Sequence, residues 1–193
     1  MRHIKDISWA EVNKNWKDSE DNEIWQDFYR AKGFNTWEEW REPRIKMLKL
    51  ENREWNLEGT DRVIEEVRGM VCDATTRWAD FYKDRNDSTF EKLKDHEFFA
   101  KHKKVVEMRE NFPNGSQIIG LRNQGKIIVV DGHHRATALA GMDKNVSDPK
   151  VNFAIADIEN REFEKLYKGG RFLTLERNIF TAASLIRAKI RNI

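Results

Sequence analysis

The sequence predicts an α+β fold, a small mixed sheet with helices packed against it, on three observations. Residues 117–121 and 126–130 are short apolar runs rich in β-branched residues, and Asn123-Gln124-Gly125 between them is typical of a hairpin turn. Residues 151–158 read V-N-F-A-I-A-D-I, a further strand of the same kind. The remaining segments carry apolar residues mostly at helical spacing.

The composition indicates one domain over residues 1–193. Seven Trp and eleven Phe offset an apolar fraction of only 39%. Charged residues make up 35%, but the net charge is +2, so the balance speaks against a nucleic-acid partner. The lone Cys72, the lack of an apolar leader and the lack of a membrane-length stretch favour a cytoplasmic protein without a membrane partner.

Residues 1–43 are expected to form an aromatic helical layer. Ser8-x-x-Glu11 and Thr36-x-x-Glu39 match the capping box that opens helices. Between them, a helix over residues 21–32 should end at the following glycine. The tryptophans of this layer either attach it to the core or line a ligand site, and they are Trp9, Trp16, Trp25, Trp37 and Trp40.

Residues 44–158 are expected to form the core. Pro43 should break the preceding helix. Residues 45–50 then suggest a first strand, although their period also permits continued helix. Residues 51–60 are expected to be a loop, and residues 61–71 an amphipathic helix.

The core is interrupted by a charge-rich helical insertion at about residues 73–110, in which Ser88-x-x-Glu91 resembles a third capping box. A helical tail over residues 159–193 follows the last strand and begins with a short helix at residues 160–167. The basic residues at its end complement a helix dipole and need no nucleic-acid partner.

The chemistry is concentrated in Asp131-Gly132-His133-His134-Arg135, between a predicted strand and an Ala/Leu-rich helix. Gly132 permits a sharp turn and a close ligand, and the free N–H groups of the helix start attract an anion. Arg135 can add a charged hydrogen bond to a phosphate, about 1.5–3 kcal/mol. His133 and His134 can donate to phosphate oxygens or carry protons. Asp131 can bind a metal ion or orient a histidine.

The alternative for this motif is purely structural, with Asp131 as an N-cap, Arg135 as its ion-pair partner and both histidines on the surface. Four such groups within five residues at a strand-to-helix turn favour the functional interpretation. A structural zinc site is disfavoured because adjacent histidines point in different directions and the sole cysteine is distant in sequence.

The hairpin followed by V-V-D-G-H-H-R-x-x-A-L resembles the ParB/sulfiredoxin superfamily, and its D-G-H-H-R is most similar to archaeal free serine kinases. The similarity is specific over residues 116–141, extends to the strand at residue 151 and continues more weakly over residues 45–71. The resemblance implies a ParB/sulfiredoxin-like core with nucleotide phosphates at the turn. Sulfiredoxins carry Cys where this chain has His133, so sulfinic-acid repair is not expected. Partition proteins continue into a helix-turn-helix domain where this chain has a short tail.

The resemblance therefore implies an ATP- or ADP-dependent kinase of a small hydroxyl substrate, such as a free amino acid, with Mg2+. The serine kinases activate the hydroxyl with an acid in the loop after the first strand, a place nearest to Glu58, with Glu54 as the second choice. Trp55 either shapes the acceptor pocket or belongs to the core. The expected catalytic residues are Glu58, Asp131 and His133, the phosphate ligands are Gly132, His133, His134 and Arg135, and the metal ligand is Asp131.

Two alternatives from other functional classes stay open. One is a nucleotide-dependent, DNA-associated module, and the other is a nuclease or NTPase without small-molecule kinase activity.

Overall fold

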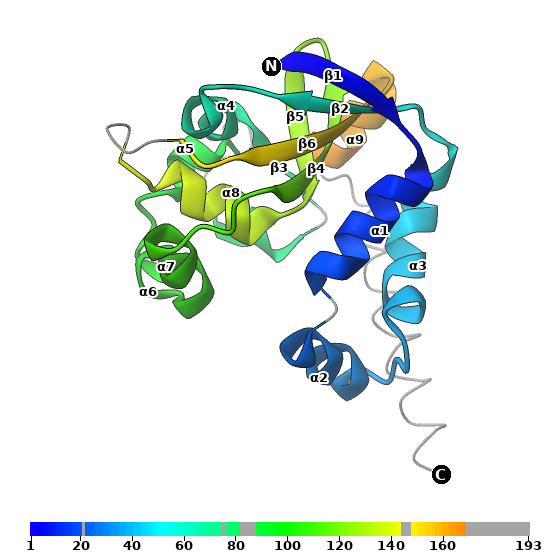
Figure 1. Ribbon diagram of the computed structural model, residues 1–193, viewed down its shortest axis with the longest axis horizontal. Helices are drawn as coiled ribbons and strands as arrows, with labels where there is room; N and C mark the ends of the chain where they lie inside the picture. The colour runs from blue at the N-terminus through cyan, green and yellow to red at the C-terminus, as the bar shows by residue number, and fades with distance from the viewer. Residues whose placement is uncertain (21, 75, 82–87, 144–147, 169–193) are drawn as a thin grey trace.

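The computed structural model describes residues 1–20, 22–74, 76–81, 88–143 and 148–168, and a six-stranded mixed sheet forms its centre (Figure 1). The strand order is β1-β2-β6-β4-β5-β3. β4 is parallel to β6 and antiparallel to β5, whereas β3 is parallel to β5. The strands are β1 (Arg2–Ile7), β2 (Trp55–Gly59), β3 (Val71–Cys72), β4 (Ser116–Asn123), β5 (Lys126–Asp131) and β6 (Val151–Asp157).

Helices cover both faces of this sheet, with α1, α3 and α9 on one side and α4 to α8 on the other (Figure 1). The described residues form nine α-helices and two 3-10 helices, η1 and η2. Their bounds are α1 (Trp9–Glu20), α2 (Glu23–Ala31), α3 (Trp37–Met47), η1 (Leu50–Asn52), α4 (Val63–Gly69), η2 (Arg77–Phe81), α5 (Phe90–Leu93), α6 (Glu97–Lys101), α7 (Lys103–Glu110), α8 (His133–Ala140) and α9 (Asn160–Lys168). The mixed α/β architecture expected from the sequence is confirmed.

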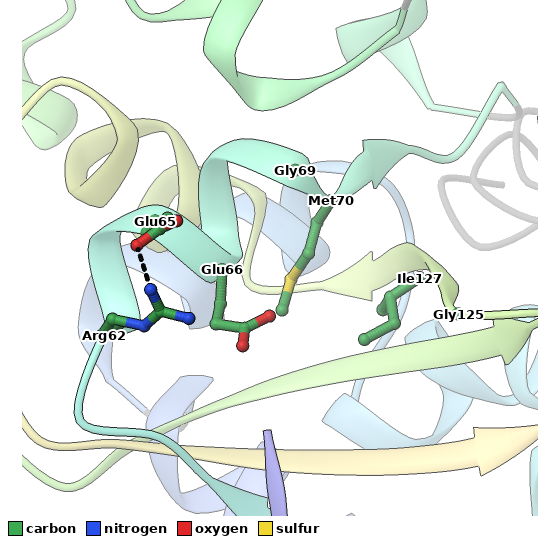
Figure 2. Close-up of a pocket in the computed structure, with 7 residues that line it drawn as sticks. All are labelled: Arg62, Glu65, Glu66, Gly69, Met70, Gly125 and Ile127. Atoms are coloured by element: carbon green, nitrogen blue, oxygen red, sulfur yellow. Dashed lines mark ion pairs between the residues drawn. The ribbon is translucent and has the colours of Figure 1, made fainter.

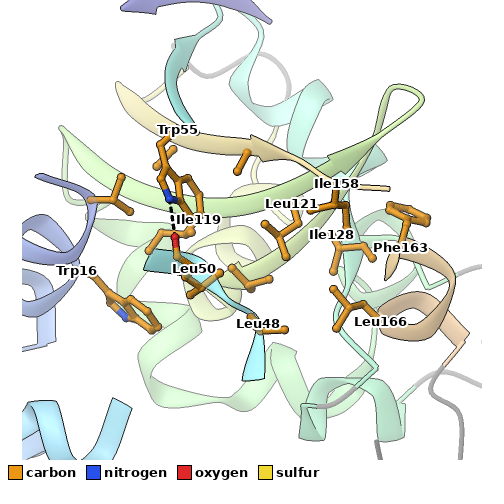
Figure 3. Close-up of a cluster of buried hydrophobic side chains, with 14 of the residues drawn as sticks. Trp16, Leu48, Leu50, Trp55, Ile119, Leu121, Ile128, Ile158, Phe163 and Leu166 are labelled. Atoms are coloured by element: carbon orange, nitrogen blue, oxygen red, sulfur yellow. Dashed lines mark hydrogen bonds between the residues drawn. The ribbon is translucent and has the colours of Figure 1, made fainter. Parts of the chain in front are cut away.

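The two helical layers enclose two hydrophobic clusters, because neighbouring side chains of a strand point to opposite faces. Ile119 and Leu121 of β4 pack with Trp16 of α1 and Phe163 of α9 on one face (Figure 3). Ile118, one residue earlier, packs on the other face with the apolar residues of α4 to α8. The sheet thus carries a hydrophobic core on each side.

The elements with strong local signals form as expected. The β4–β5 hairpin turns at Gln124 and Gly125, whose φ angles of 46° and 82° suit the tight turn that a two-residue connection needs. At the start of α1, the Ser8 backbone N–H donates to Glu11 Oε2 at 2.9 Å, and the Glu11 N–H donates to Ser8 Oγ at 3.2 Å. This is the complete capping box.

The expected strand at residues 45–50 is wrong, because α3 continues through Pro43 to Met47. A proline inside a helix removes one hydrogen bond and costs about 3 kcal/mol. Contacts on both sides of the proline outweigh this cost. Trp37 is 2% exposed, and the Arg41 and Arg44 side chains are held by buried carboxylates.

The expected loop at residues 51–60 is also wrong, because it contains β2. This strand pairs with β1 through His3↔Glu58 and with β6 through Glu58↔Phe153. β1 itself was not expected, since residues 1–43 were interpreted as helical only. Both strands are short and lack a clean alternation, so pairing with distant segments decides their structure.

The insertion at residues 73–110 contains η2 and three short helices, and Ser88 does not cap any of them. The Ser88 carbonyl accepts a hydrogen bond from the Cys72 N–H at 2.9 Å, and α5 begins after Thr89. His96 Nδ1 accepts the Phe98 N–H at 3.2 Å, which starts a new helix at Glu97. The helix expected at residues 160–167 is present as α9, and the basic helix expected beyond it lies outside the described residues.

No helix in the described ranges combines the length and apolar character needed to cross a membrane.

Candidate functional site

A cavity of about 680 Å³ lies at the end of β5, where the two helical layers meet. The N-terminal layer contributes the end of α1 and the inner faces of α2 and α3. The opposite wall comes from η2, α7 and the start of α8. Segments that are more than one hundred residues apart in sequence therefore share one concave surface.

The D-G-H-H-R turn lines this cavity. Gly132 has a φ of 92°, a conformation that suits glycine, and a Cβ there would lie 3.1 Å from Ile118 Cγ1. The first backbone bond of α8 runs from the Ala136 N–H to the Gly132 carbonyl at 2.8 Å. The N–H groups of the three residues before Ala136 therefore have no acceptor within the helix, and they strengthen the positive end of its dipole.

Asp131 is a buried counter-ion for two arginines. Its Oδ2 accepts a hydrogen bond from Arg135 Nη2 at 2.9 Å, and its Oδ1 lies 3.9 Å from Arg41 Nη2. Burial alone would raise the pKa of this carboxyl group, but the charges of Arg135 and Arg41 outweigh it and lower the pKa. Asp131 is thus ionised and paired, whereas Gly132 occupies the N-cap position.

Arg41 connects Asp131 with a second buried carboxylate. Glu20, 5% exposed, accepts hydrogen bonds at 2.8 Å from Arg41 Nε and from Trp37 Nε1. Burial and the nearby Asp131 charge raise the pKa of Glu20, and Arg41 opposes this shift. The guanidinium of Arg41 also lies 3.7 Å from the centre of the Trp40 ring, so its orientation is set on three sides.

Arg44, one helical turn further along α3, reaches the same cavity. Its Nη2 donates to Asp73 Oδ2 at 2.6 Å and to the carbonyl of Val130 at 2.9 Å. Asp73 is fully buried. These bonds connect α3 to the end of β5 and keep a third guanidinium beside the turn.

Both histidines of the motif are neutral at pH 7. His133 is 9% exposed, and burial, followed by the charge of Arg44, lowers its pKa to about 4. Burial and the charge of Lys104 lower the pKa of His134 to about 3. Within the described part of the chain, His133 Nε2 is buried without a hydrogen-bond partner. A neutral imidazole nitrogen in this position can accept or donate a hydrogen bond to a ligand.

Aromatic rings form one wall of the cavity. Trp25 and Trp40 lie with ring centres 5.3 Å apart, and Phe28 packs against both. Trp78 of η2 stands across the start of α8, 4.6 Å from the His134 ring. Planar apolar surface and hydrogen-bonding groups thus face the same space.

The charges of the cavity favour an anion. Counted over the described residues, five cationic side chains line it, against two carboxylates. An incoming phosphate or carboxylate would meet oriented guanidinium groups and the backbone N–H groups at the start of α8. The cations are Lys32, Arg41, Arg44, Lys104 and Arg135, and the carboxylates are Glu20 and Asp131.

No family model, curated protein or solved structure matches this chain. All five residues of the D-G-H-H-R motif line the cavity, so the structure brings this part of the expected site together.

The structure does not bring Glu58 to this cavity. Its Oε1 accepts a hydrogen bond at 2.6 Å from Nη1 of Arg122, which also pairs with Asp157. Glu54 is exposed ahead of β2. Trp55 is 2% exposed in the core, where its Nε1 donates to the Leu50 carbonyl at 2.9 Å (Figure 3).

The sequence interpretation missed the residues that other elements bring to the cavity. Trp40, Arg41 and Arg44 lie within five positions, a spacing that places them close together on a continuous helix. Because the helix was expected to end at Pro43, Arg44 was not placed on the same helix as Trp40 and Arg41. Glu20 and Lys104 had no local signal, because only the packing of α1 and α7 brings them near the turn.

The described residues do not fit a resident Mg2+ at Asp131. Across these ranges, no group of three or more His, Cys, Asp or Glu side chains could hold a metal ion. The carboxylates of Asp131 and Glu20 already face arginines.

A second, smaller pocket of about 230 Å³ lies between α4 and the β4–β5 turn (Figure 2). It contains the Arg62–Glu65 ion pair at 3.2 Å and Glu66, which binds the N-terminal amine of Met1 at 3.0 Å. Its two acids outnumber its single arginine, so the pocket has no excess of positive charge. This pocket lacks the features of an anion site.

Proposed function

We propose that the protein binds a nucleotide in the cavity at the end of β5 and transfers or hydrolyses its terminal phosphate. The observation that carries this proposal is the meeting of an anion-attracting helix start with a tryptophan wall inside one 680 Å³ cavity. A nucleotide has both features that such a cavity recognises, a planar base and a polyanionic chain.

In this proposal the phosphates contact the start of α8. The N–H groups of the first turn, Arg135 and Arg41 supply hydrogen bonds and charge. Asp131 keeps both guanidinium groups oriented and acts as a positioning residue. The base lies against the aromatic wall formed by Trp25, Phe28 and Trp40.

His133 is the proposed proton acceptor. A substrate hydroxyl or a water molecule attacks the terminal phosphorus, the bond from phosphorus to the bridging oxygen breaks, and the nucleotide leaves with one phosphate fewer. The proton of the attacking group passes to Nε2 of His133. Glu58 takes no part, because its carboxylate is paired with Arg122 outside the cavity. The D-G-H-H-R resemblance to free serine kinases supports an amino-acid hydroxyl as the acceptor.

Nucleotide binding is tested by calorimetry with ATP and ADP in the presence of Mg2+. Arg135→Ala should weaken binding by at least about 1 kcal/mol, roughly fivefold. The matched control is Arg62→Ala, since the Arg62 side chain is 73% exposed at the other pocket. Equal affinities for both variants and the wild type would contradict a phosphate site at this turn.

The transfer step is tested separately. The wild type is incubated with ATP or ADP, Mg2+ and a pool of amino acids, and phosphorylated products and free phosphate are followed by mass spectrometry. His133→Gln should bind nucleotide but form no product. A wild type that binds nucleotide and yields neither product would refute catalysis and leave a nucleotide-dependent module.

A salt titration with DNA tests the DNA-associated alternative. Affinity that survives physiological salt would support this alternative over the kinase.

A further inference from the structure

Lys104 differs from the arginines of the cavity in how its charge is held. It lies on α7, in the segment expected only as an insertion, and its Nζ is 4.1 Å from the centre of the Trp25 ring. Among the described residues it forms no ion pair. Each arginine beside it has a carboxylate partner: Arg135 has Asp131, Arg41 has Glu20 and Arg44 has Asp73.

The position of Lys104 relative to the turn is set by packing. α7 packs directly against α8, whose first turn presents N–H groups that have no acceptor within the helix. The ammonium group of Lys104 interacts with the charges of Glu20, Arg135 and Asp131, so it belongs to the same electrostatic site. Burial lowers the pKa of Lys104, although the charges of Glu20 and Asp131 oppose this shift, so the ammonium group has lost part of its hydration.

We propose that Lys104 binds one phosphate group of a ligand that carries at least two, while the start of α8 binds another. The ligand class is then a nucleoside diphosphate or triphosphate, and a nucleoside monophosphate would bind without satisfying Lys104. This inference rests on the proposed nucleotide site and adds the number of phosphate groups that the site selects. The ring of Trp25 holds the ammonium group in place until the ligand arrives.

The test compares affinities for AMP, ADP and ATP, measured by calorimetry, in the wild type, Lys104→Met and Lys103→Met. The wild type should bind ADP at least about tenfold more tightly than AMP, because one charged hydrogen bond contributes at least that much binding free energy. Lys104→Met should lose most of this gain while its AMP affinity changes little. Lys103→Met is the matched control, because the Lys103 side chain is 89% exposed and faces Glu107 on the outside of α7.

Lys104→Arg retains the charge and should retain most of the preference for ADP over AMP. Urea unfolding shows whether each variant is folded. If Lys104→Met is unfolded, Lys104→Gln is measured instead. A folded Lys104→Gln should lose most of the preference for ADP over AMP. If a folded Lys104 variant without the charge keeps the wild-type preference for ADP over AMP, the inference is overturned and nucleotide binding itself stands. A wild type that binds none of the three nucleotides would overturn the proposed function itself.

Discussion

The burial of neutral His133 predicts how folding stability depends on pH. The pKa of this side chain falls from 6.5 to about 4 in the folded protein, because burial and the charge of Arg44 disfavour the imidazolium. Below pH 6.5 the unfolded chain takes up a proton that the folded protein refuses until about pH 4. The unfolded state therefore binds more protons in this window, and stability falls as the pH falls.

The size of the effect follows from the two pKa values. One pH unit corresponds to about 1.4 kcal/mol, so His133 costs about 2 kcal/mol of folding free energy at pH 5 and about 3 kcal/mol near pH 4. A domain with a total stability of about 5–15 kcal/mol loses a measurable share. His134, whose pKa is lowered to about 3, changes stability in the same direction.

The assay is urea unfolding at pH 7.5 and pH 5, followed by circular dichroism, for the wild type and His133→Gln. The wild type should lose about 2 kcal/mol more than the variant over this pH change, because glutamine does not titrate. His3→Gln is the control, since the His3 side chain is 54% exposed and the variant should retain the wild-type loss. Equal losses for the wild type and His133→Gln would refute the buried neutral imidazole.

Three further predictions concern single substitutions. Pro43→Ala should raise the free energy of unfolding by about 1–2 kcal/mol, because the backbone donor that it restores inside α3 outweighs the greater freedom of the unfolded chain. A lower melting temperature would contradict a continuous helix. Glu58→Gln should cost about 1–3 kcal/mol of stability through its buried bond to Arg122 and leave nucleotide affinity and turnover unchanged, whereas a folded variant that binds but does not turn over would restore Glu58 as the base. Gly132→Ala should destabilise the protein by about 1–3 kcal/mol and weaken nucleotide binding, since its φ is 92° and the new Cβ would lie 3.1 Å from Ile118; a wild-type melting temperature would show that the turn has another conformation.

The sequence was sufficient where neighbouring residues form the structure together. The β4–β5 hairpin depends on two apolar runs and the Gln124-Gly125 turn, and the start of α1 depends on Ser8 and Glu11. In each case the partners lie within a few residues of one another. Local geometry then selects the structure without help from the rest of the chain.

The sequence was insufficient where a distant partner decides. α3 continues through Pro43 because Glu20 and Asp73 bind arginines on either side of it, and neither partner is visible from the helix itself. β2 is a strand because β1 and β6 pair with its two edges. A short segment with mixed pattern takes the structure that its tertiary neighbours stabilise.

The same division holds for the candidate site. The sequence by itself predicted an anion site at this turn, because Gly132, the histidines and Arg135 follow one another at the start of a helix. Only the tertiary structure decided what surrounds that point. It placed Arg41 and Lys104 in the cavity and left Glu58 outside it, since the positions of helices α3 and α7 depend on the packing of two separate hydrophobic clusters.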